Sequence, residues 1–256
     1  MNPKVVLTTG ADNGIGLAMT QTLLAVGYRV AALDLSTVNL EPLRAAHPDQ
    51  LTLSVCDVSD EKQVKTAVEA VVQKWERIDI VVNNAALAIF KKFEERTVGE
   101  TRREFDVNYF GYVNVIAAVL PHMKTRGGII HNMSSGVGIT GFARLAGYTS
   151  TKGAIESLTR TLAIEFAPYG IRVNVMHPPL TNTKSASPLG VPTQALADPA
   201  IVGRNLAKKI ESTKPVIASD LQTAVYLFFA YRYPLFFGRL FSKLSDKNNL
   251  HSLQEK

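Results

Sequence analysis

The sequence predicts an α/β fold, a doubly wound parallel sheet within a single domain of 256 residues. Short apolar runs of strand length alternate with helical stretches over the first two thirds of the chain. Glycines or polar residues follow most of the apolar runs. Strand–helix–strand connections are right-handed in nearly all proteins, so this alternation builds a parallel sheet whose ligands bind beyond the carboxyl ends of the strands. A chain of this length can bury the core of one large domain.

The first apolar run, Lys4 to Thr9, leads into a glycine-rich turn and then a helical pattern. The turn contains Gly10, Gly14 and Gly16. Glycines let the backbone approach a pyrophosphate closely, and the N-terminus of the following helix offers free N–H groups and a partial positive charge. A glycine-rich turn alone is weak evidence, but between a strand and a helix it is a candidate dinucleotide site.

The second expected strand, Tyr28 to Leu33, ends in Asp34, eighteen residues after the last glycine of that turn. A carboxylate at this place accepts hydrogen bonds from the ribose hydroxyls of adenosine and repels a 2′-phosphate. Leu35, Ser36 and Asn13 provide no cation that would bind such a phosphate. We therefore expect NAD to be preferred over NADP. The alternative role of Asp34 is that of a turn or helix-cap residue.

Further strands and helices follow in alternation. The expected strands are Leu51–Val55, Ile78–Val82, Gly128–Met133 and Ile171–Met176, and the expected long helices are Glu61–Trp75, Asn108–Met123 and Gly147–Ala167. No strand is expected after the sixth.

Tyr148 and Lys152 lie four residues apart in a helical stretch, so their side chains share one face. A loop with three glycines precedes them and allows Ser135 to return over Tyr148. The pKa of a phenol is about 10, and an ammonium about 6 Å away lowers it by about two units. Tyr148 is thus a candidate general acid or base. An isolated pair at this spacing is more typical of an ordinary surface helix, so the neighbouring motifs decide.

Together these motifs resemble the short-chain dehydrogenase/reductase family over about residues 4 to 183. The resemblance rests on TGADNGIG at Thr9–Gly16, Asp34, Asp57-Val58, NNAA at 83–86, Asn108, Ser135, Tyr148-x-x-x-Lys152 and the stretch PPLTNT that ends at Thr183. It implies a Rossmann fold and a nicotinamide dinucleotide.

The resemblance also implies a relay of four residues. Tyr148 would exchange a proton with the substrate oxygen, and Ser135 would hydrogen-bond that oxygen. Lys152 would lower the pKa of the tyrosine and hold the nicotinamide ribose, while Asn108 would position a water. The residues expected at the cofactor are Gly10, Asn13, Gly14, Ile15, Gly16, Asp34, Asp57, Val58, Asn84, Tyr148, Lys152 and Thr183.

Two residues depart from the family's pattern: Ala86 and Pro179 stand where glycines are usual. A methyl group at Ala86 intrudes on the floor of the cleft, and Pro179 removes a backbone N–H. Neither change removes a reacting group. A non-catalytic dinucleotide sensor is the alternative that these departures suggest, and the complete relay argues against it.

The expected reaction interconverts a secondary alcohol and a ketone, with dehydration or epimerisation as the alternative reaction types. The candidate cleft residues are apolar: Ala86, Leu87, Val137, Ile139, Phe142 and Leu145. We therefore expect a substrate with a sizeable apolar body, such as a steroid, a terpenoid or another ring compound.

Residues 184–256 are expected to form a substrate lid at 184–198 and a divergent helical extension, after a core of residues 1–183. This part holds ten Lys/Arg against five Asp/Glu and so carries most of the net charge of +6. Eight of the twenty aromatic residues lie in Tyr226–Phe241. Aromatics of this density are expected to cover the cleft or a dimer interface. The alternative is peripheral contact of residues 226–243 with a membrane.

The apolar helices Asn108–Met123 and Gly147–Ala167 have more than one apolar stripe, so we expect at least a homodimer through them, with a tetramer less secure. The missing C-terminal strand is expected to remove a second interface that tetrameric family members use. No metal site, nucleic-acid partner or membrane span is expected. Cytoplasm is the expected location, because the single cysteine suits a reducing compartment and the N-terminus shows no secretory signal.

Overall fold

A parallel sheet of seven strands forms the centre of the molecule, in the order β3-β2-β1-β4-β5-β6-β7. The computed structural model describes residues 3–189, 191 and 193–254. The strands are β1 (Val5–Thr9), β2 (Arg29–Asp34), β3 (Leu51–Val55), β4 (Ile80–Asn83), β5 (Gly128–Met133), β6 (Ile171–His177) and β7 (Val216–Ala218). The strand order reverses between β1 and β4, which is the point where doubly wound sheets bind ligands. The fold is the expected doubly wound Rossmann type.

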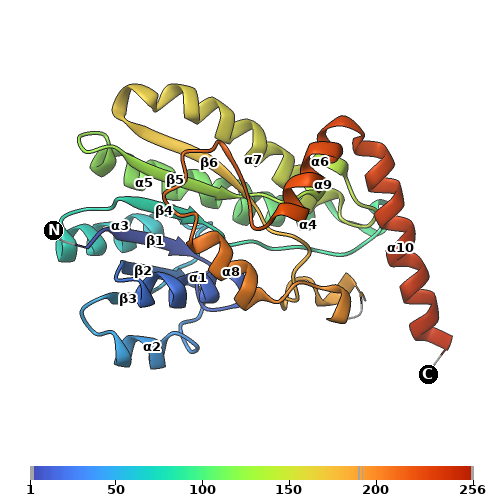
Figure 1. The fold of residues 1–256 in the computed structure, drawn as a ribbon, viewed down its shortest axis with the longest axis horizontal. Coiled ribbons are helices and arrows are strands. Elements are labelled where there is room, and N and C mark those ends of the chain that lie inside the picture. Colours follow the sequence, from blue (N-terminus) through green and yellow to red (C-terminus); the bar gives the residue numbers. More distant parts are fainter. Residues whose placement is uncertain (1–2, 190, 192, 255–256) are drawn as a thin grey trace.

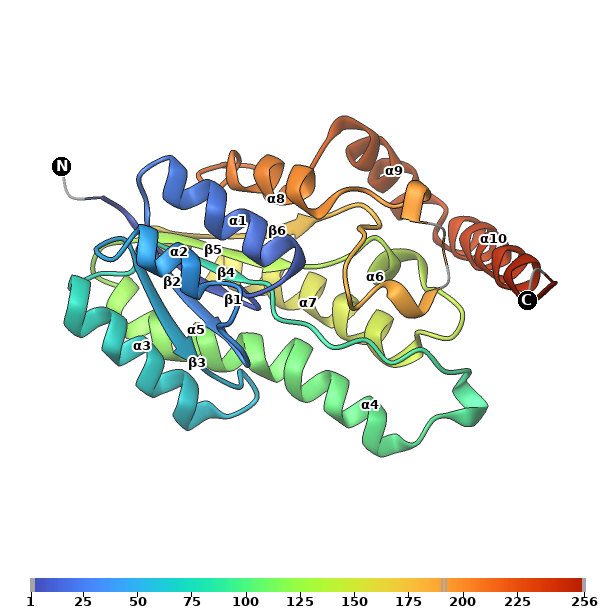
Figure 2. The same cartoon turned by 90° about the horizontal axis from the view of Figure 1, so that it is seen from below.

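Two layers of helices cover the sheet (Figures 1 and 2). Apolar side chains of α3 and α5, with the end of α7, pack on one face, and those of α1 and α8 pack on the other. The helices are α1 (Gly14–Ala25), α2 (Glu41–Ala46), α3 (Glu61–Trp75), α4 (Val98–Phe105), α5 (Gly111–Met123), α6 (Val137–Thr140), α7 (Ala146–Glu165), α8 (Pro199–Ala207), α9 (Leu221–Arg232) and α10 (Pro234–Gln254). The central strands are buried from both sides, which explains their nearly continuous apolar sequences.

Local capping explains where two of these helices begin. Asp60 accepts hydrogen bonds from the backbone N–H groups of Lys62 and Gln63 at the start of α3. Thr97 and Glu100 form a reciprocal capping box at the start of α4. Such caps satisfy N–H groups that have no partner within the helix.

The expectation that the C-terminal strand is missing is wrong. β7 pairs with β6 in parallel, with Val175 opposite Val216 and His177 opposite Ala218. The strand has only three residues and follows Pro215, which has no N–H to donate to a sheet ladder. Its sequence is therefore too short to be distinguished from a loop by periodicity.

The helix expected from Asn108 begins differently. A π-helix, η2 (Asp106–Phe110), joins α4 to α5, and Asn108 lies in its wider turn. Because a π-turn inserts one residue, it shifts the side chains on either side relative to a continuous α-helix. The preceding α4 was not expected from the sequence, since half of its eight residues are charged and only Val98 and Phe105 are large and apolar.

The C-terminal helices α9 and α10 lie beside α6, near the carboxyl end of the sheet, and α10 extends away from the body (Figures 1 and 2). The expected lid begins with a bridge between Thr181 and Ala197 and contains two short 3-10 helices, Ser187–Leu189 and Thr193–Ala195. Residues 190 and 192 of this segment, and 255–256 of the extension, lie outside the described residues.

Candidate active site

The glycine-rich turn has the backbone geometry that a phosphate cradle requires. Gly10 and Gly14 adopt positive φ angles of 61° and 54°. A Cβ at Gly16 would collide with the carbonyl oxygen of Gly10, so only glycine allows α1 to approach β1 this closely. Asn13 is the N-cap residue of α1, and its side chain forms no capping hydrogen bond. The first N–H groups of α1, from Gly14 to Gly16, are thus available for an anion.

Asp34 ends β2 next to this turn and holds it in place. Its Oδ2 accepts a hydrogen bond of 2.8 Å from the backbone N–H of Asp12, and its Oδ1 accepts a longer one, 3.4 Å, from Ser36. Among the described residues Asp34 forms no ion pair. The carboxylate therefore retains lone pairs for a ribose and has no cation beside it for a 2′-phosphate.

Asn84 and Thr183 both lie against the glycine-rich turn. The Asn84 amide Nδ2 donates to the carbonyl oxygens of Thr9 and Gly10 at 3.1 and 2.9 Å. A Cβ at Gly14 would lie 3.0 Å from the Thr183 methyl group. Asn84 thus connects the end of β4 to the turn and supports it from within the protein.

Asp57 and Val58 lie between β3 and α3, near the same edge of the sheet. The Asp57 carboxylate accepts hydrogen bonds from Ser59 and forms the turn into α3. Val58 is buried, and its carbonyl oxygen accepts from Asn114 of α5. The structure therefore brings the expected cofactor residues to one edge of the sheet, and the turn, the free helix N-terminus and Asp34 fit a dinucleotide.

Tyr148 and Ser135 are brought together by two elements that are distant from the dinucleotide turn in sequence. Ser135 follows β5 and Tyr148 lies in the first turn of α7, and the Ser135 side chain lies near enough to the Tyr148 hydroxyl to lower its pKa. Both residues are partly exposed. The neighbouring Ser134 is buried instead, and its hydroxyl donates to the carbonyl oxygen of Lys152 at 3.3 Å. Ser135 is therefore the serine that can reach a bound substrate.

Lys152 is one turn further along α7 and is buried. Its Nζ donates to the carbonyl oxygen of Met133 at 2.8 Å and to the Tyr112 hydroxyl at 3.2 Å. The same Nζ lies 5.6 Å from the centre of the Tyr148 ring. The contact with Tyr112 was not expected from the sequence, although Tyr112 lies four residues after Asn108 on the same helical segment.

The protonation of this pair differs from the expectation. Burial is the main cause that raises the pKa of Tyr148 to about 12. Ser135 lowers this pKa by less than burial raises it, and the Glu104 carboxylate also raises it. Burial lowers the pKa of Lys152 to about 7, although Glu156 opposes this shift. The expected lowering of the tyrosine pKa is therefore wrong for the ligand-free chain. That expectation included the ammonium charge but not the cost of burying either ion.

Asn108 is fully buried and connects three segments. Its Oδ1 accepts from the Leu87 N–H at 2.7 Å, and its Nδ2 donates to the Leu87 carbonyl oxygen and to Thr151 Oγ1 at 2.8 and 3.0 Å. The Asn108 side chain thus fixes the segment after β4 against α7. Thr151, which precedes Lys152, was not identified from the sequence. The expected water at Asn108 remains a prediction.

A buried ion pair lies beneath the start of α7. Arg96 and Glu104 form a salt bridge, and Glu104 Oε1 also accepts from the Ile89 N–H at 2.8 Å. A Cβ at Gly147 would collide with this carboxylate. Burial raises the pKa of Glu104 even beside Arg96. The pair therefore fixes the residue that immediately precedes Tyr148.

The expected cleft residues occupy different positions. Leu87, Val137, Ile139 and Phe142 are partly exposed and Ala86 is exposed. Leu145 is buried at the start of α7, where it packs inside the protein, so its inclusion in the cleft was wrong. Pro179 is partly exposed, and its carbonyl oxygen accepts from Thr181 at 2.7 Å.

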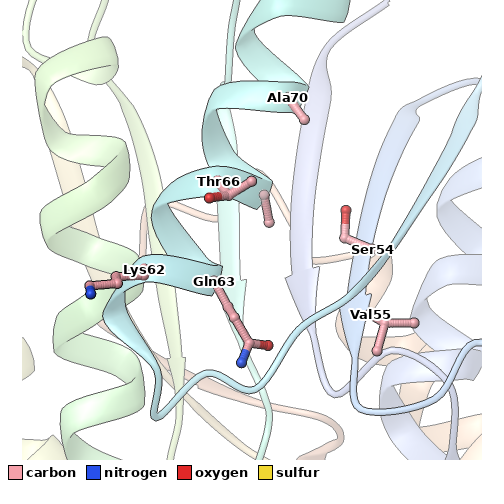
Figure 3. Close-up of a pocket in the computed structure, with 7 residues that line it drawn as sticks. Ser54, Val55, Lys62, Gln63, Thr66 and Ala70 are labelled. Carbon is pink, nitrogen blue, oxygen red and sulfur yellow. The ribbon is translucent and has the colours of Figure 1, made fainter.

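A separate hollow lies between β3 and the first turns of α3 (Figure 3). Its lining includes Ser54, Lys62, Gln63 and Thr66. β2, β1 and β4 separate β3 from β5, after which Ser135 follows. The hollow contains none of the relay residues, and we assign it no part in the chemistry. Among the described residues, no group of three or more His, Cys, Asp or Glu side chains is arranged to hold a metal ion.

The family model of short chain dehydrogenases matches residues 4–191, which include the glycine-rich turn, Asp34, Ser135, Tyr148 and Lys152. The chain belongs to the short-chain dehydrogenase/reductase family. It is thus an oxidoreductase of a family that binds nicotinamide dinucleotides. None of its described helices is long and apolar enough to cross a membrane.

Two curated relatives show the range within this family. The chain is 36% identical over 188 residues to 2-(R)-hydroxypropyl-CoM dehydrogenase of Xanthobacter autotrophicus, covering 70% of this chain and 75% of the relative. It is also 36% identical over 185 residues to levodione reductase of Leifsonia aquatica, covering 68% of each.

Two solved structures share the fold of this short-chain dehydrogenase. The 3-ketoacyl-(acyl-carrier-protein) reductase of Brucella melitensis complexed with NADH has a TM-score of 0.76 and 28% identity, over 84% of this chain and 96% of that one. ElxO with NADP bound has a TM-score of 0.77 and 25% identity, over 87% and 99% of the two chains. Members with this fold therefore include both NADH and NADP complexes.

Proposed function

We propose that this short-chain dehydrogenase interconverts a secondary alcohol and a ketone with NAD(H) as its cofactor. The observation that carries the proposal is that the Ser135 side chain lies beside the Tyr148 hydroxyl, with Lys152 Nζ 5.6 Å from the centre of the Tyr148 ring. Two hydroxyl groups at this place can both hydrogen-bond one substrate oxygen. A reaction that creates or removes charge on that oxygen needs such a pair.

Each residue has a defined part in this proposal. Ser135 orients the substrate oxygen, and Tyr148 donates a proton to it during reduction or accepts one during oxidation. Because its pKa is raised to about 12, Tyr148 is protonated at neutral pH, which is the form that donates a proton during reduction. Lys152 holds the end of β5 through Met133 and lies beside the tyrosine. The bound nicotinamide would supply or accept the hydride.

The preference for NAD rests on Asp34. Its carboxylate stands beside the glycine-rich turn without an ion-pair partner among the described residues, so a 2′-phosphate would meet a negative charge. We expect NADH to bind more tightly than NADPH in a direct comparison of dissociation constants. Asp34→Ala combined with Leu35→Arg should move the preference towards NADPH. Tighter binding of NADPH to the wild-type chain would contradict the assignment.

The proposed substrate carries its alcohol or ketone on an apolar body such as a steroid, a terpenoid or another ring compound. Support comes from the partly exposed apolar side chains of Leu87, Val137, Ile139 and Phe142 near the relay. The two relatives named above are a 2-(R)-hydroxypropyl-CoM dehydrogenase and a levodione reductase, and their different substrates do not decide the substrate class of this chain.

A panel of alcohols and ketones, followed at the NADH absorbance band, tests the reaction. We expect turnover of bulky apolar secondary alcohols or their ketones. Efficient turnover confined to small charged sugars or acids would contradict the substrate class. Product analysis that shows dehydration or epimerisation without net NADH change would contradict the reaction type, and binding of NADH with no turnover of any compound would favour a sensor.

We also propose a homodimer formed through α5 and α7. Tyr112, Ile116 and Val119 are buried within one chain, which reduces the apolar surplus expected from the sequence. Leu120 and Leu162 are only partly buried, however, and Ile164 is 77% exposed. Since β7 is present, the reason for excluding a second interface no longer holds. A monomeric mass in light scattering would contradict the dimer. A reducing compartment, suited to the free Cys56, is the proposed location.

A further inference from the structure

The C-terminal helices expose an unusual number of large apolar side chains. Leu221 of α9 is 80% exposed and Phe228 is 72% exposed, while Leu235 and Phe236 of α10 are 68% and 63% exposed. We call the surface formed by these residues, together with Val225 and Leu244, the C-terminal apolar face. Exposed large apolar side chains concentrated on two adjoining helices indicate a surface that another surface covers.

The charge of this segment has one sign. Residues 221–245 contain Arg232, Arg239 and Lys243 and no Asp or Glu. All three cations are exposed, and none forms a salt bridge within the described part of the chain. The partner of this face should therefore offer both apolar material and negative charge.

The same helices are attached firmly to the body by their other sides. Leu227 and Ala230 of α9 are buried, and the Tyr226 ring lies against Gly136. The Tyr231 hydroxyl donates to Glu156 Oε2 at 2.8 Å, and Ser242 Oγ of α10 accepts from the Ala143 N–H at 3.0 Å. Inward contacts thus account for only part of each helix. Of the aromatic residues expected to cover the cleft or a dimer interface, Tyr226 contacts Gly136, while Phe228 and Phe236 are exposed in the single chain.

Charge favours a lipid surface over a second copy of the chain as the partner. In a two-fold dimer the same patch meets itself, so the three cations of one copy would approach the three of the other with no acidic residue within 221–245 to neutralise them. An anionic lipid surface satisfies both requirements, since aromatic and aliphatic side chains enter the headgroup–acyl boundary while Arg and Lys meet the phosphates.

We propose that this short-chain dehydrogenase docks on anionic membrane surfaces through the C-terminal apolar face, with α9 and α10 lying on the interface. The docked site would stand close to the lipid, because Tyr226 of α9 touches Gly136, the residue after Ser135. Docking itself does not depend on the proposed reaction. If that proposal holds, an apolar substrate dissolved in the membrane would reach the relay over a short distance.

Flotation with vesicles of phosphatidylcholine alone, or mixed with phosphatidylserine, tests the proposal. The full chain should float with the mixed vesicles, bind the neutral vesicles much more weakly, and dissociate as the salt concentration rises. Arg239→Gln with Lys243→Gln should weaken binding about 25-fold. Phe228→Ala with Phe236→Ala should weaken it about tenfold or more.

Matched controls use exposed residues elsewhere on the molecule. Phe93→Ala removes a phenylalanine that is 82% exposed, and Lys62→Gln with Lys65→Gln removes two exposed cations of α3. These variants should float like the wild type. All variants should keep the wild-type melting temperature and NADH affinity, which separates failure of docking from failure of folding.

Three results would overturn the proposal. One is the absence of flotation with the mixed vesicles. Another is flotation that the control variants weaken as much as the C-terminal variants do. The last combines two observations: the wild-type chain does not bind the vesicles, and the double variant Phe228→Ala with Phe236→Ala has a lower particle mass than the wild type in light scattering. The face would then be a contact between copies of the chain.

Discussion

The edge of the sheet around Tyr148 and the helix pair α9–α10 both contain tyrosine and lysine residues, but these side chains are mostly buried in the first region and mostly exposed in the second. At the sheet edge, tyrosine and lysine side chains are turned inward: Lys152 and Tyr112 are buried and hydrogen-bonded to each other. In the helix pair, Tyr233 and Lys243 are turned outward. The family model covers the first region and ends at residue 191.

This difference shows what each region can do. Buried polar groups with complete hydrogen bonding fix side-chain positions, which a reaction requires. Exposed aromatic and basic side chains provide no such fixed geometry, but they can bind a soft, extended surface. Substitutions of matched residues in the two regions should therefore affect different properties. Those at the sheet edge should mainly lower activity, and those near the C-terminus should mainly lower stability or membrane docking.

Two lysines that bind carbonyl oxygens give the largest expected contrast. Lys152 donates to the carbonyl oxygen of Met133. Lys209 donates to the carbonyl oxygens of Ala218 and Ser219, at the end of β7, at 2.6 and 2.9 Å. Lys152→Met should lower kcat about 100-fold or more. Lys209→Met should leave kcat within about twofold and lower the free energy of unfolding by about 1–2 kcal/mol. Equal losses of kcat in the two variants would contradict the assignment of Lys152 to the reaction and of Lys209 to stability.

Substitution of one glycine in each region should change the affinity for NADH in one region and leave it unchanged in the other. In Gly16→Ala the new Cβ meets the Gly10 carbonyl oxygen, so the NADH dissociation constant should rise about tenfold or more. In Gly238→Ala it meets the Thr140 carbonyl oxygen, so α10 should separate from α6 and be cleaved faster by protease while NADH affinity is kept. Gly99→Ala, where nothing lies closer than 3.8 Å, is the control and should behave as wild type.

The buried lysine should also change how stability depends on pH. The pKa of Lys152 is lowered from 10.5 to about 7, so between these values the unfolded chain binds more protons than the folded one. The free energy of unfolding should therefore rise with pH in this window, by up to about 1.4 kcal/mol per pH unit from this group.

Urea unfolding of the wild type and Lys152→Met at pH 7, 8 and 9 measures this effect. The wild type should gain stability relative to the variant at each step, because the methionine that replaces Lys152 has no proton to lose. Parallel pH profiles for the two proteins would show that Lys152 is not desolvated as the structure indicates.

The smallest expected effect comes from the link between the two regions. Tyr231→Phe removes the hydrogen bond from α9 to Glu156, a carboxylate of α7 that also lies 2.9 Å from His177 Nε2. Since Tyr231 is 46% exposed, the loss of unfolding free energy should be about 1 kcal/mol. Tyr233→Phe, which removes an exposed hydroxyl without a hydrogen bond in the described structure, should change nothing measurable. Equal effects of both changes would show that the link carries no stability.

Sequence periodicity predicted the sheet well where strands are buried on both faces. The runs that became β1 and β2 are largely apolar and buried, and the glycines after β1 mark the turn because of the backbone conformations that they adopt. β7 could not be predicted in this way. Its three residues are held by pairing with β6, which is a contact between distant parts of the chain.

The spacing of Tyr148 and Lys152 predicted that they share a face, because helical geometry alone decides this. The connections through Tyr112 and Thr151 depend on how α5, the π-helix and α7 pack, which no local pattern contains. The pKa of Tyr148 was predicted in the wrong direction for the ligand-free chain for the same reason. Burial is a property of the folded molecule, and here it outweighs the opposing effect of Ser135 on the pKa of Tyr148.

The measurement that tests the central claim most directly is turnover by Tyr148→Phe with the best substrate from the alcohol and ketone panel. The variant should lose about 10²- to 10⁴-fold in kcat, because the proton donor is removed, while its NADH dissociation constant stays within about threefold of wild type. Tyr233→Phe serves as the matched control. Near wild-type turnover by Tyr148→Phe with NADH still bound would contradict the account, since the hydroxyl beside Ser135 would then have no part in the reaction.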